Sequence, residues 1–189
     1  MQNLQALQVE AQQDYHKCNT LQRLAVDTVM GCITSNNPTL FFLDGPGGTG
    51  KTFIENLLLN TIRAEGDIAI AVASSGIAAT LLNAGRTAHS TLKIPISIDK
   101  DSYCNIPKDS PLEQQIQQTK ILIWDEAPMQ HRHAFEAVDR TIRDIRDSYN
   151  QAFGGLTVLF GGDFRQCLPV VPRGSSAQIV ASCLKRSYL

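Results

Sequence analysis

The sequence predicts an α/β fold in which helices cover both faces of a mostly parallel sheet. Short apolar runs of strand length alternate along the chain with segments whose apolar residues recur at helical spacing. Glycine-rich or acidic motifs directly follow several of the apolar runs. Because ligands of such sheets bind at the carboxyl ends of the strands, we expect these motifs to meet at one edge. The 189 residues suit one domain with a substantial core.

The N-terminal part of the chain is expected to contain a capped helix. Residues 1–18 form a polar, Gln-rich segment that fits either a helix or a loose tail. Asn19 or Thr20 is placed to cap the helix, which should end near residues 36–38, where two Asn precede a Pro. The predicted inner face carries Leu21, Leu24, Ala25 and Thr28, with Val29 beside it.

Four apolar runs are predicted to be buried strands, and a long helix is predicted between the first two. The strands are residues 40–43, 68–73, 121–124 and 156–160. The helix spans residues 51–64 and follows the first strand after a short loop. Its apolar face carries Ile54, Leu57, Leu58 and Ile62.

Two further segments differ in their patterning. Residues 84–111 contain three Pro and several Asp and Ser, which predicts an irregular surface excursion. Residues 131–149 are predicted to form an amphipathic helix with a solvated, charged outer face. Its inner positions are Phe135, Val138, Ile142, Ile145 and Tyr149. Its outer face pairs Asp139 with Arg143, Arg140 with Asp144, and Arg143 with Asp147.

Residues 45–52 have the form G-x-x-x-x-G-K-T, which is typical of a phosphate-binding P-loop. The loop comprises Gly45, Pro46, Gly47, Gly48, Thr49, Gly50, Lys51 and Thr52. Its glycines let successive N–H groups point at an anion, and the following helix adds its positive N-terminal end. Lys51 is predicted to contact the outer phosphates, and the Thr52 hydroxyl to ligate Mg²⁺. A strand before the loop and a helix after it favour this interpretation over a chance glycine-rich turn.

Two further motifs supply side chains for phosphate chemistry. Asp125 and Glu126 directly follow a predicted strand, where Asp125 can hold Mg²⁺ opposite the P-loop and Glu126 can activate water. Alone, such a pair would more simply cap a helix, but the P-loop favours the functional interpretation. Gln166 lies in a glycine-rich motif after the next strand, and it either reports the γ-phosphate or belongs to an ordinary turn.

Five motifs occur in an order that resembles the first RecA-like lobe of Pif-type DNA helicases of superfamily one. They are residues 45–52, 74–79, 85–90, 124–129 and 161–169. The sequence Gly-Arg-Thr-Ala-His-Ser and the sequence Gly-Gly-Asp-Phe-Arg-Gln look most like the Helitron transposon branch. The resemblance covers residues 19–189 and implies a RecA-like P-loop NTPase that uses ATP and Mg²⁺ to move 5′-to-3′ on single-stranded DNA. Such helicases act in DNA repair, recombination and telomere maintenance.

The resemblance also implies individual roles. Lys51, Thr52 and Asp125 would hold nucleotide and Mg²⁺, Glu126 would activate water, and Gln166 would sense the γ-phosphate. Gln22 falls where these helicases carry a Gln that reads adenine. The residues implied to face single-stranded DNA are Ser74, Ser75, Gly76, His89 and Ser90. Without the resemblance, Ser74 to Gly76 would be interpreted as a helix cap and His89 as a polar loop residue.

Helicases of this type hydrolyse ATP between two lobes, and the second lobe supplies an arginine finger. A second lobe would begin near Leu189, so we expect this chain to bind ATP weakly, to hydrolyse it poorly and not to unwind DNA alone. One alternative is another class of P-loop ATPase, such as a clamp-loader-type ATPase or a nucleotide kinase. A second alternative is a non-catalytic ATP- and DNA-binding remnant of a transposon helicase.

Composition limits the partners and the compartment. The formal net charge is −1, so any nucleic-acid contact must be local and must use hydroxyls and backbone groups as well as cations. The five cysteines are scattered, which favours free thiols in a reducing compartment over disulfides or a zinc site. No apolar run approaches a membrane span, and the polar N-terminus differs from a signal peptide. We therefore expect an intracellular protein, and the resemblance to these helicases implies the nucleus, with the mitochondrion as the alternative.

Overall fold

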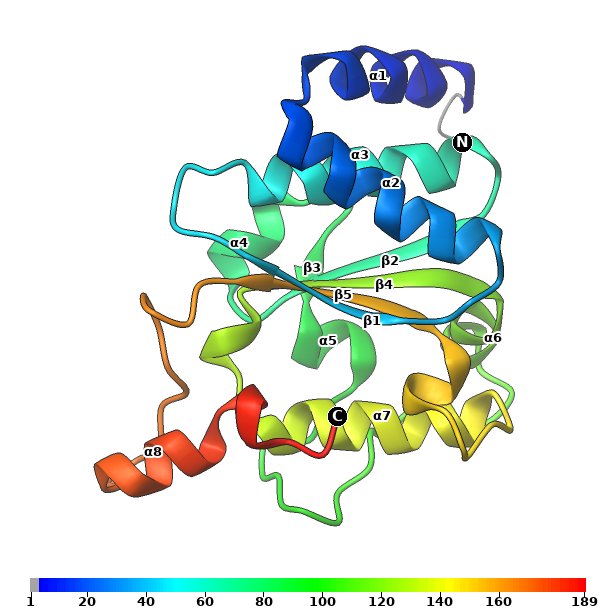
Figure 1. Ribbon diagram of the computed structural model, residues 1–189. Helices are drawn as coiled ribbons and strands as arrows, with labels where there is room; N and C mark the ends of the chain where they lie inside the picture. Colours follow the sequence, from blue (N-terminus) through cyan, green and yellow to red (C-terminus); the bar gives the residue numbers. More distant parts are fainter. Residues whose placement is uncertain (1–3) are drawn as a thin grey trace.

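The computed structural model describes residues 4–189, and in them a sheet of parallel strands has the order β1-β5-β4-β2-β3 (Figure 1). The strands are β1 Leu40–Asp44, β2 Ile68–Ala73, β3 Arg86–Thr87, β4 Thr119–Asp125 and β5 Thr157–Gly162. The α-helices are α1 Leu4–Lys17, α2 Thr20–Thr34, α3 Lys51–Ala64, α4 Gly76–Leu81, α5 Ala88–Leu92, α6 Pro111–Gln118, α7 Arg132–Ile145 and α8 Ser176–Ser182. Short 3-10 helices are η1 Ala127–Met129, η2 Ala152–Gly155 and η3 Leu184–Arg186. This architecture confirms the predicted α/β class.

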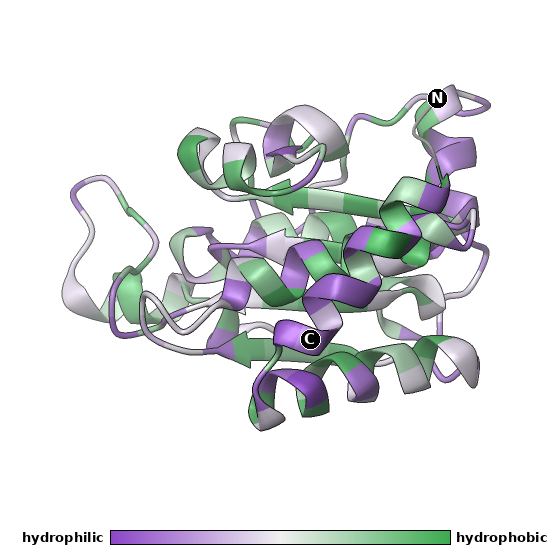
Figure 2. Cartoon of the chain, turned by 90° about the horizontal axis from the view of Figure 1, so that it is seen from above, coloured by the Kyte–Doolittle hydropathy of each residue, from purple (hydrophilic) through white to green (hydrophobic). Residues whose placement is uncertain are grey.

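Helices cover both faces of the sheet, and each face has its own hydrophobic core. Figure 1 shows α1 to α4 on one side of the sheet and α5 to α7 on the other. The strands are apolar nearly throughout, whereas the helices mix apolar and polar residues (Figure 2). This difference is expected because a central parallel strand is buried on both faces and a covering helix on one. No helix in the described part of the chain combines the length and apolar character that a bilayer crossing requires.

The four strands predicted from apolar runs are present, with ends that differ by one or two residues. The helix predicted at residues 51–64 is α3, and its four predicted inner residues are all buried. Strand β5 continues through Gly161 and Gly162, so these glycines extend the sheet and do not form a turn. Gly161 pairs with Leu43 and Gly162 with Asp44 in the neighbouring strand β1. The motif after β5 therefore begins beside the end of β1.

The face predicted for α2 was wrong. Leu21 and Leu24 are 77% and 62% exposed, and Thr28 is also exposed, whereas Val26 and Val29 are buried. The reason is that α1 forms a helix and packs on α3, so α2 turns its Val26 and Val29 side toward α1 and α3. The Asn19 cap is confirmed: its side chain accepts from the backbone N–H of Gln22.

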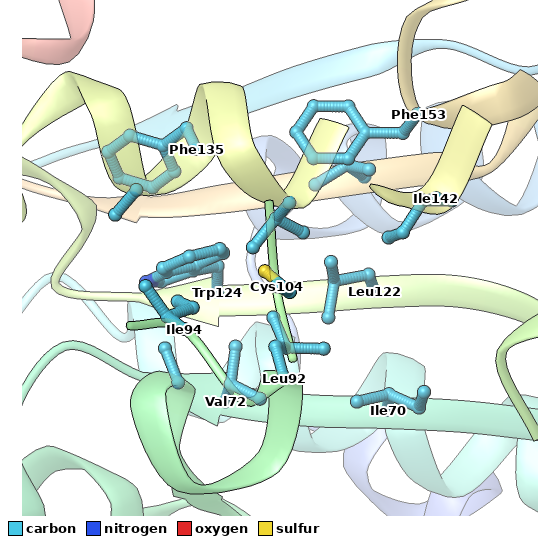
Figure 3. Packing of buried hydrophobic residues seen from close by; sticks show 14 of the residues in the cluster. Ile70, Val72, Leu92, Ile94, Cys104, Leu122, Trp124, Phe135, Ile142 and Phe153 are labelled. Carbon is cyan, nitrogen blue, oxygen red and sulfur yellow. The ribbon is translucent and has the colours of Figure 1, made fainter. Parts of the chain in front are cut away.

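The segment at residues 84–111 contributes to the core and is not wholly an irregular excursion. It contains β3 and α5, and Leu92, Ile94 and Cys104 are buried. Figure 3 shows these three side chains packed around Trp124 and the strand residues beside it. Burial raises the pKa of the Cys104 thiol to about 11. In this segment the buried apolar residues lie between prolines and polar residues. Its composition therefore wrongly predicted an irregular surface excursion.

The helix predicted at residues 131–149 ends early, and its charged face is not fully solvated. Helix α7 stops at Ile145, so Tyr149 lies beyond it and is 59% exposed. Asp139 is fully buried because η2 packs over it, and its carboxylate accepts from the backbone N–H of Phe153. The predicted pair with Arg143 is present, with Nε 2.9 Å from the Asp139 carboxylate. The other two predicted pairs are replaced: Arg140 donates to the Ser102 carbonyl, Tyr149 donates to Asp144, and Asp147 lies past the helix.

Candidate nucleotide-binding site

The predicted chemical motifs meet at one edge of the sheet. The P-loop follows β1, Asp125 ends β4, and the loop that carries Gln166 follows β5. Strands β1, β5 and β4 are neighbours in the sheet, so their carboxyl ends lie side by side. In Figure 1 the loop after β1 and the loop after β5 both lie on the left of the view. The topology thus brings three distant sequence segments to one place.

The P-loop has the backbone shape that its glycines predict. Gly48 and Gly50 have φ values of 79° and 86°, which disfavour residues with a side chain. A Cβ on Gly45 would lie 2.7 Å from Thr49 Oγ1, so this position is also closely packed. Lys51 Nζ donates to the carbonyl oxygens of Gly45 at 2.6 Å and Pro46 at 3.3 Å. The ammonium therefore lies over the loop, where a phosphate would compete for it.

Asp125 and Glu126 form an acidic corner at the end of β4. Asp125 is 3% exposed, and burial raises the pKa of its carboxyl while Lys51 lowers it. Glu126 is half-buried and has a φ of 52°, and its backbone N–H donates to Asp125 Oδ1 at 2.8 Å. The 3-10 helix η1 begins after Glu126 without a side-chain cap hydrogen bond. The alternative that this pair serves to cap a helix is therefore not supported.

Both predicted glutamines contact the P-loop. Gln22 Nε2 donates to the Thr49 carbonyl at 3.3 Å, and its Oε1 accepts from the Asn19 backbone. Gln166 lies near Gly47, because a Cβ placed on Gly47 would be 3.4 Å from Gln166 Nε2. The loop around Gln166 is held by Asp163, whose carboxylate accepts from the backbone N–H and Nε of Arg165. Each amide thus has a place beside the loop that would hold a nucleotide.

The segments predicted to face DNA lie next to this site. Ser75 caps α4, accepting from the Ala78 backbone at 3.2 Å, so the helix-cap interpretation is correct as far as it goes. The Ser74 hydroxyl accepts from Trp124 Nε1 at 3.1 Å. Gly76 begins α4, and His89 and Ser90 are exposed on α5. The two short helices follow β2 and β3, so they belong to the same end of the sheet.

Sequence reasoning missed Glu55 as a member of this site. It lies on α3 four residues after Lys51, is 0% exposed, and has no hydrogen-bond partner for either carboxyl oxygen within residues 4–189. A Cβ on Gly161 would collide with Glu55 Oε1 and would lie 3.2 Å from Asp125 Oδ1. The i,i+4 spacing from Lys51, which places both residues on one helix face, was the available signal.

The oxygen donors around the P-loop suit Mg²⁺. The Thr52 hydroxyl and the Asp125 carboxylate are hard ligands of the kind that this ion prefers, and Glu55 provides orphaned carboxyl oxygens nearby. In the described residues no three His, Cys, Asp or Glu side chains are arranged to hold a metal ion by themselves. That arrangement fits Mg²⁺, which usually keeps several waters and is shared with substrate phosphates.

Comparison with known proteins agrees with this geometry. A family model described as "PIF1-like helicase" matches residues 17–189. The ATP-dependent DNA helicase Pif1 of Psychrobacter sp. (strain PRwf-1) is 33% identical over 150 residues, which are 78% of this chain and 22% of that protein.

Two solved structures from Bacteroides have the same fold. Pif1 in complex with ADP-AlF3 and single-stranded DNA superposes with a TM-score of 0.71 at 24% identity, covering 87% of this chain and 38% of that one. Pif1 bound to single-stranded DNA superposes with a TM-score of 0.64 at 27% identity, covering 80% and 34%. This chain spans about a fifth of the length of the curated relatives that it matches. Because the family model covers nearly all of residues 4–189, the chain belongs to the PIF1-like helicase family.

Proposed function

We propose that this chain is the ATP-binding lobe of an ATP-dependent DNA helicase that translocates on single-stranded DNA. In this proposal Lys51 and the P-loop amides hold the phosphates, and Thr52 and Asp125 hold Mg²⁺. When bound, Mg²⁺ would neutralise charge on the phosphates. Gln166 senses the γ-phosphate and Gln22 contacts adenine. Their contacts to the P-loop support these two roles, since each amide already lies beside the place of a nucleotide.

Glu126 is proposed to orient and deprotonate the attacking water. Its carboxyl group is half-buried, and burial and the adjacent Asp125 raise its pKa, while Lys51 lowers it. A raised pKa makes a carboxylate a better proton acceptor near neutral pH. The positive φ of Glu126 shows that the chain changes direction directly after β4.

The junction between β2 and β4 is the observation that carries the proposal. Ala73 pairs with Asp125, the Ser74 backbone N–H donates to the Asp125 carbonyl at 3.0 Å, and Trp124 Nε1 donates to the Ser74 hydroxyl. The candidate Mg²⁺ ligand is thus hydrogen-bonded through its backbone to the segment proposed to grip DNA. Hydroxyls and backbone amides at Ser74 to Gly76, with His89 and Ser90, would hold phosphates without reading sequence.

The finer assignments rest on the sequence resemblance. They are 5′-to-3′ polarity, the Helitron branch, a role in repair, recombination or telomere maintenance, and a second RecA-like lobe that completes the site. A DNA-acting role further places the protein in a compartment that contains DNA, the nucleus or the mitochondrion.

Replacement of Glu126 by glutamine tests the proposed chemistry. The Glu126→Gln variant should bind ATP with Mg²⁺ as tightly as the unmodified chain, because the amide keeps the size of the carboxyl. It should lose ATP hydrolysis by about 100-fold or more, because an amide cannot accept the proton of the attacking water. Fluorescent-nucleotide binding and single-turnover hydrolysis measure the two properties separately. Hydrolysis at the unmodified rate would exclude Glu126 as the base.

A further inference from the structure

Glu55 is a buried acid that no contact in the fold explains. It is 0% exposed on α3, and neither carboxyl oxygen has a hydrogen-bond partner within residues 4–189. Two other buried acids lie on α7, and both have partners: Glu136 accepts from Ser187, and Asp139 accepts from Arg143, Phe153 and Tyr188. Buried polar groups without partners are rare because each keeps its full cost of leaving water. An unpartnered carboxyl in a helix next to a P-loop therefore points to a ligand.

The surroundings of Glu55 indicate the charge of that ligand. Asp125 and Glu126 both act on Glu55 as repelling charges, and Lys51 is the attracting one. Lys51 donates its hydrogen bonds elsewhere, to the carbonyls of Gly45 and Pro46. The carboxyl groups of Glu55, Asp125 and Glu126 thus have one ammonium group nearby, that of Lys51. No ion pair within 4.0 Å joins Lys51 to any of the three. A divalent cation at the end of β4 would favour the ionised forms of all three carboxyl groups.

We propose that Glu55 is a positioning residue for the divalent cation at the nucleotide site. Its carboxyl oxygens accept hydrogen bonds from water bound to the cation, behind Asp125 and against Gly161. Asp125 and the Thr52 hydroxyl would hold the cation itself, and Glu55 would orient water bound to it. This inference rests on the proposed nucleotide site, and it adds to that site a residue outside every motif that identified it.

Gly161 brings the Glu55 carboxyl close to Asp125. A Cβ on Gly161 would collide with Glu55 Oε1, so the glycine leaves the space that the carboxyl occupies. The same Cβ would lie 3.2 Å from Asp125 Oδ1, which places the two acids on one side of Gly161. Lys51 lies one helical turn before Glu55 on the same face of α3.

The test measures nucleotide affinity at increasing free Mg²⁺ and, separately, in EDTA. Glu55→Met removes both carboxyl oxygens. The Mg²⁺ concentration at which the increase in nucleotide affinity is half-maximal should therefore rise by about 10- to 100-fold, the range typical of groups that orient metal ligands. Glu55→Gln keeps one acceptor oxygen and should give a smaller rise. Affinity in EDTA should stay unchanged in both variants. Mn²⁺ replaces Mg²⁺ in a parallel titration followed by water-proton relaxation, which reports the cation directly.

Glu65→Gln is the matched control, because Glu65 is exposed at the other end of the same helix. It should leave every value unchanged. Equal Mg²⁺ dependence in Glu55→Met and the unmodified chain would overturn the role of Glu55 while leaving the nucleotide site intact. If Glu55→Met lost the same factor of nucleotide affinity in EDTA as in Mg²⁺, Glu55 would have a structural role only. That result would also overturn the proposed role of Glu55. An unmodified chain that binds no nucleotide under either condition would overturn the proposed function together with this inference.

Discussion

Replacement of Lys51 by alanine is expected to weaken ATP binding by about 100-fold, because each charge-assisted hydrogen bond contributes about 1.5 kcal/mol or more and Lys51 would make at least two. The Lys51 ammonium donates to two loop carbonyls, and phosphate oxygens are stronger acceptors than these. The variant should fold normally, because Lys51 is half-buried and makes no ion pair within residues 4–189. Titration with a fluorescent ATP analogue measures the loss.

Lys120→Ala serves as the control for Lys51→Ala. Lys120 is exposed near the start of β4, at the opposite end of the sheet from the P-loop. Its removal subtracts the same charge, so a general electrostatic effect would appear in both variants. Equal nucleotide affinity in Lys51→Ala and the unmodified chain would show that the P-loop does not bind phosphate here.

The stability of the unmodified protein should fall as the pH rises from about 5 to about 8. Burial, with repulsion from Asp125, raises the pKa of Glu55 to about 8, and Lys51 opposes the shift. The unfolded chain ionises this carboxyl near its ordinary value of 4.5, so it releases the proton before the folded chain does. The neutral carboxyl makes its full contribution to the free energy of unfolding below pH 4.5, and this contribution is lost as the pH approaches 8. The slope is about 1.4 kcal/mol per pH unit, so the total loss is several kcal/mol.

Glu55→Gln removes this titration and should therefore flatten the pH dependence and raise the free energy of unfolding at pH 8. Chemical denaturation of both proteins at pH 5 and pH 8, without nucleotide or divalent cation, gives the comparison. We expect Glu55→Gln to be more stable but to show a weaker effect of Mg²⁺ on nucleotide affinity. This combination is typical of a residue that serves binding, because functional sites often reduce stability. Parallel pH profiles in the two proteins would contradict the assignment of this slope to Glu55.

Most of the sheet and the phosphate site were predictable from the sequence because their signals are local. Apolar runs mark the strands, and the glycines of residues 45–52 require the backbone that the structure shows. Asp125 needed only its place after a strand, since parallel topology sets the edge where it lies. Local patterns of this kind can be interpreted without knowing which elements pack on them.

Tertiary packing decided the features that sequence patterns missed. The exposed Leu21 face of α2 depends on α1 lying against α3, and nothing within α2 reports that contact. Leu92 and Cys104 are buried although their segment reads as a polar loop. Glu55 was hidden for a different reason: an acid between apolar core positions contradicts the helix pattern. Such local conflicts are expected where function, and not folding, selects the residue.

The most direct test of the central claim is the affinity of the chain for a fluorescent oligothymidylate, measured with and without a non-hydrolysable ATP analogue and Mg²⁺. Because Asp125 and Ser74 are joined through the β2–β4 junction, we predict that the nucleotide changes DNA affinity by at least about fivefold. DNA must then change nucleotide affinity by the same factor, and Lys51→Ala should abolish both effects. Identical DNA affinities with and without nucleotide would contradict the proposal that this site and the segment at Ser74 form one ATP-driven DNA-binding lobe.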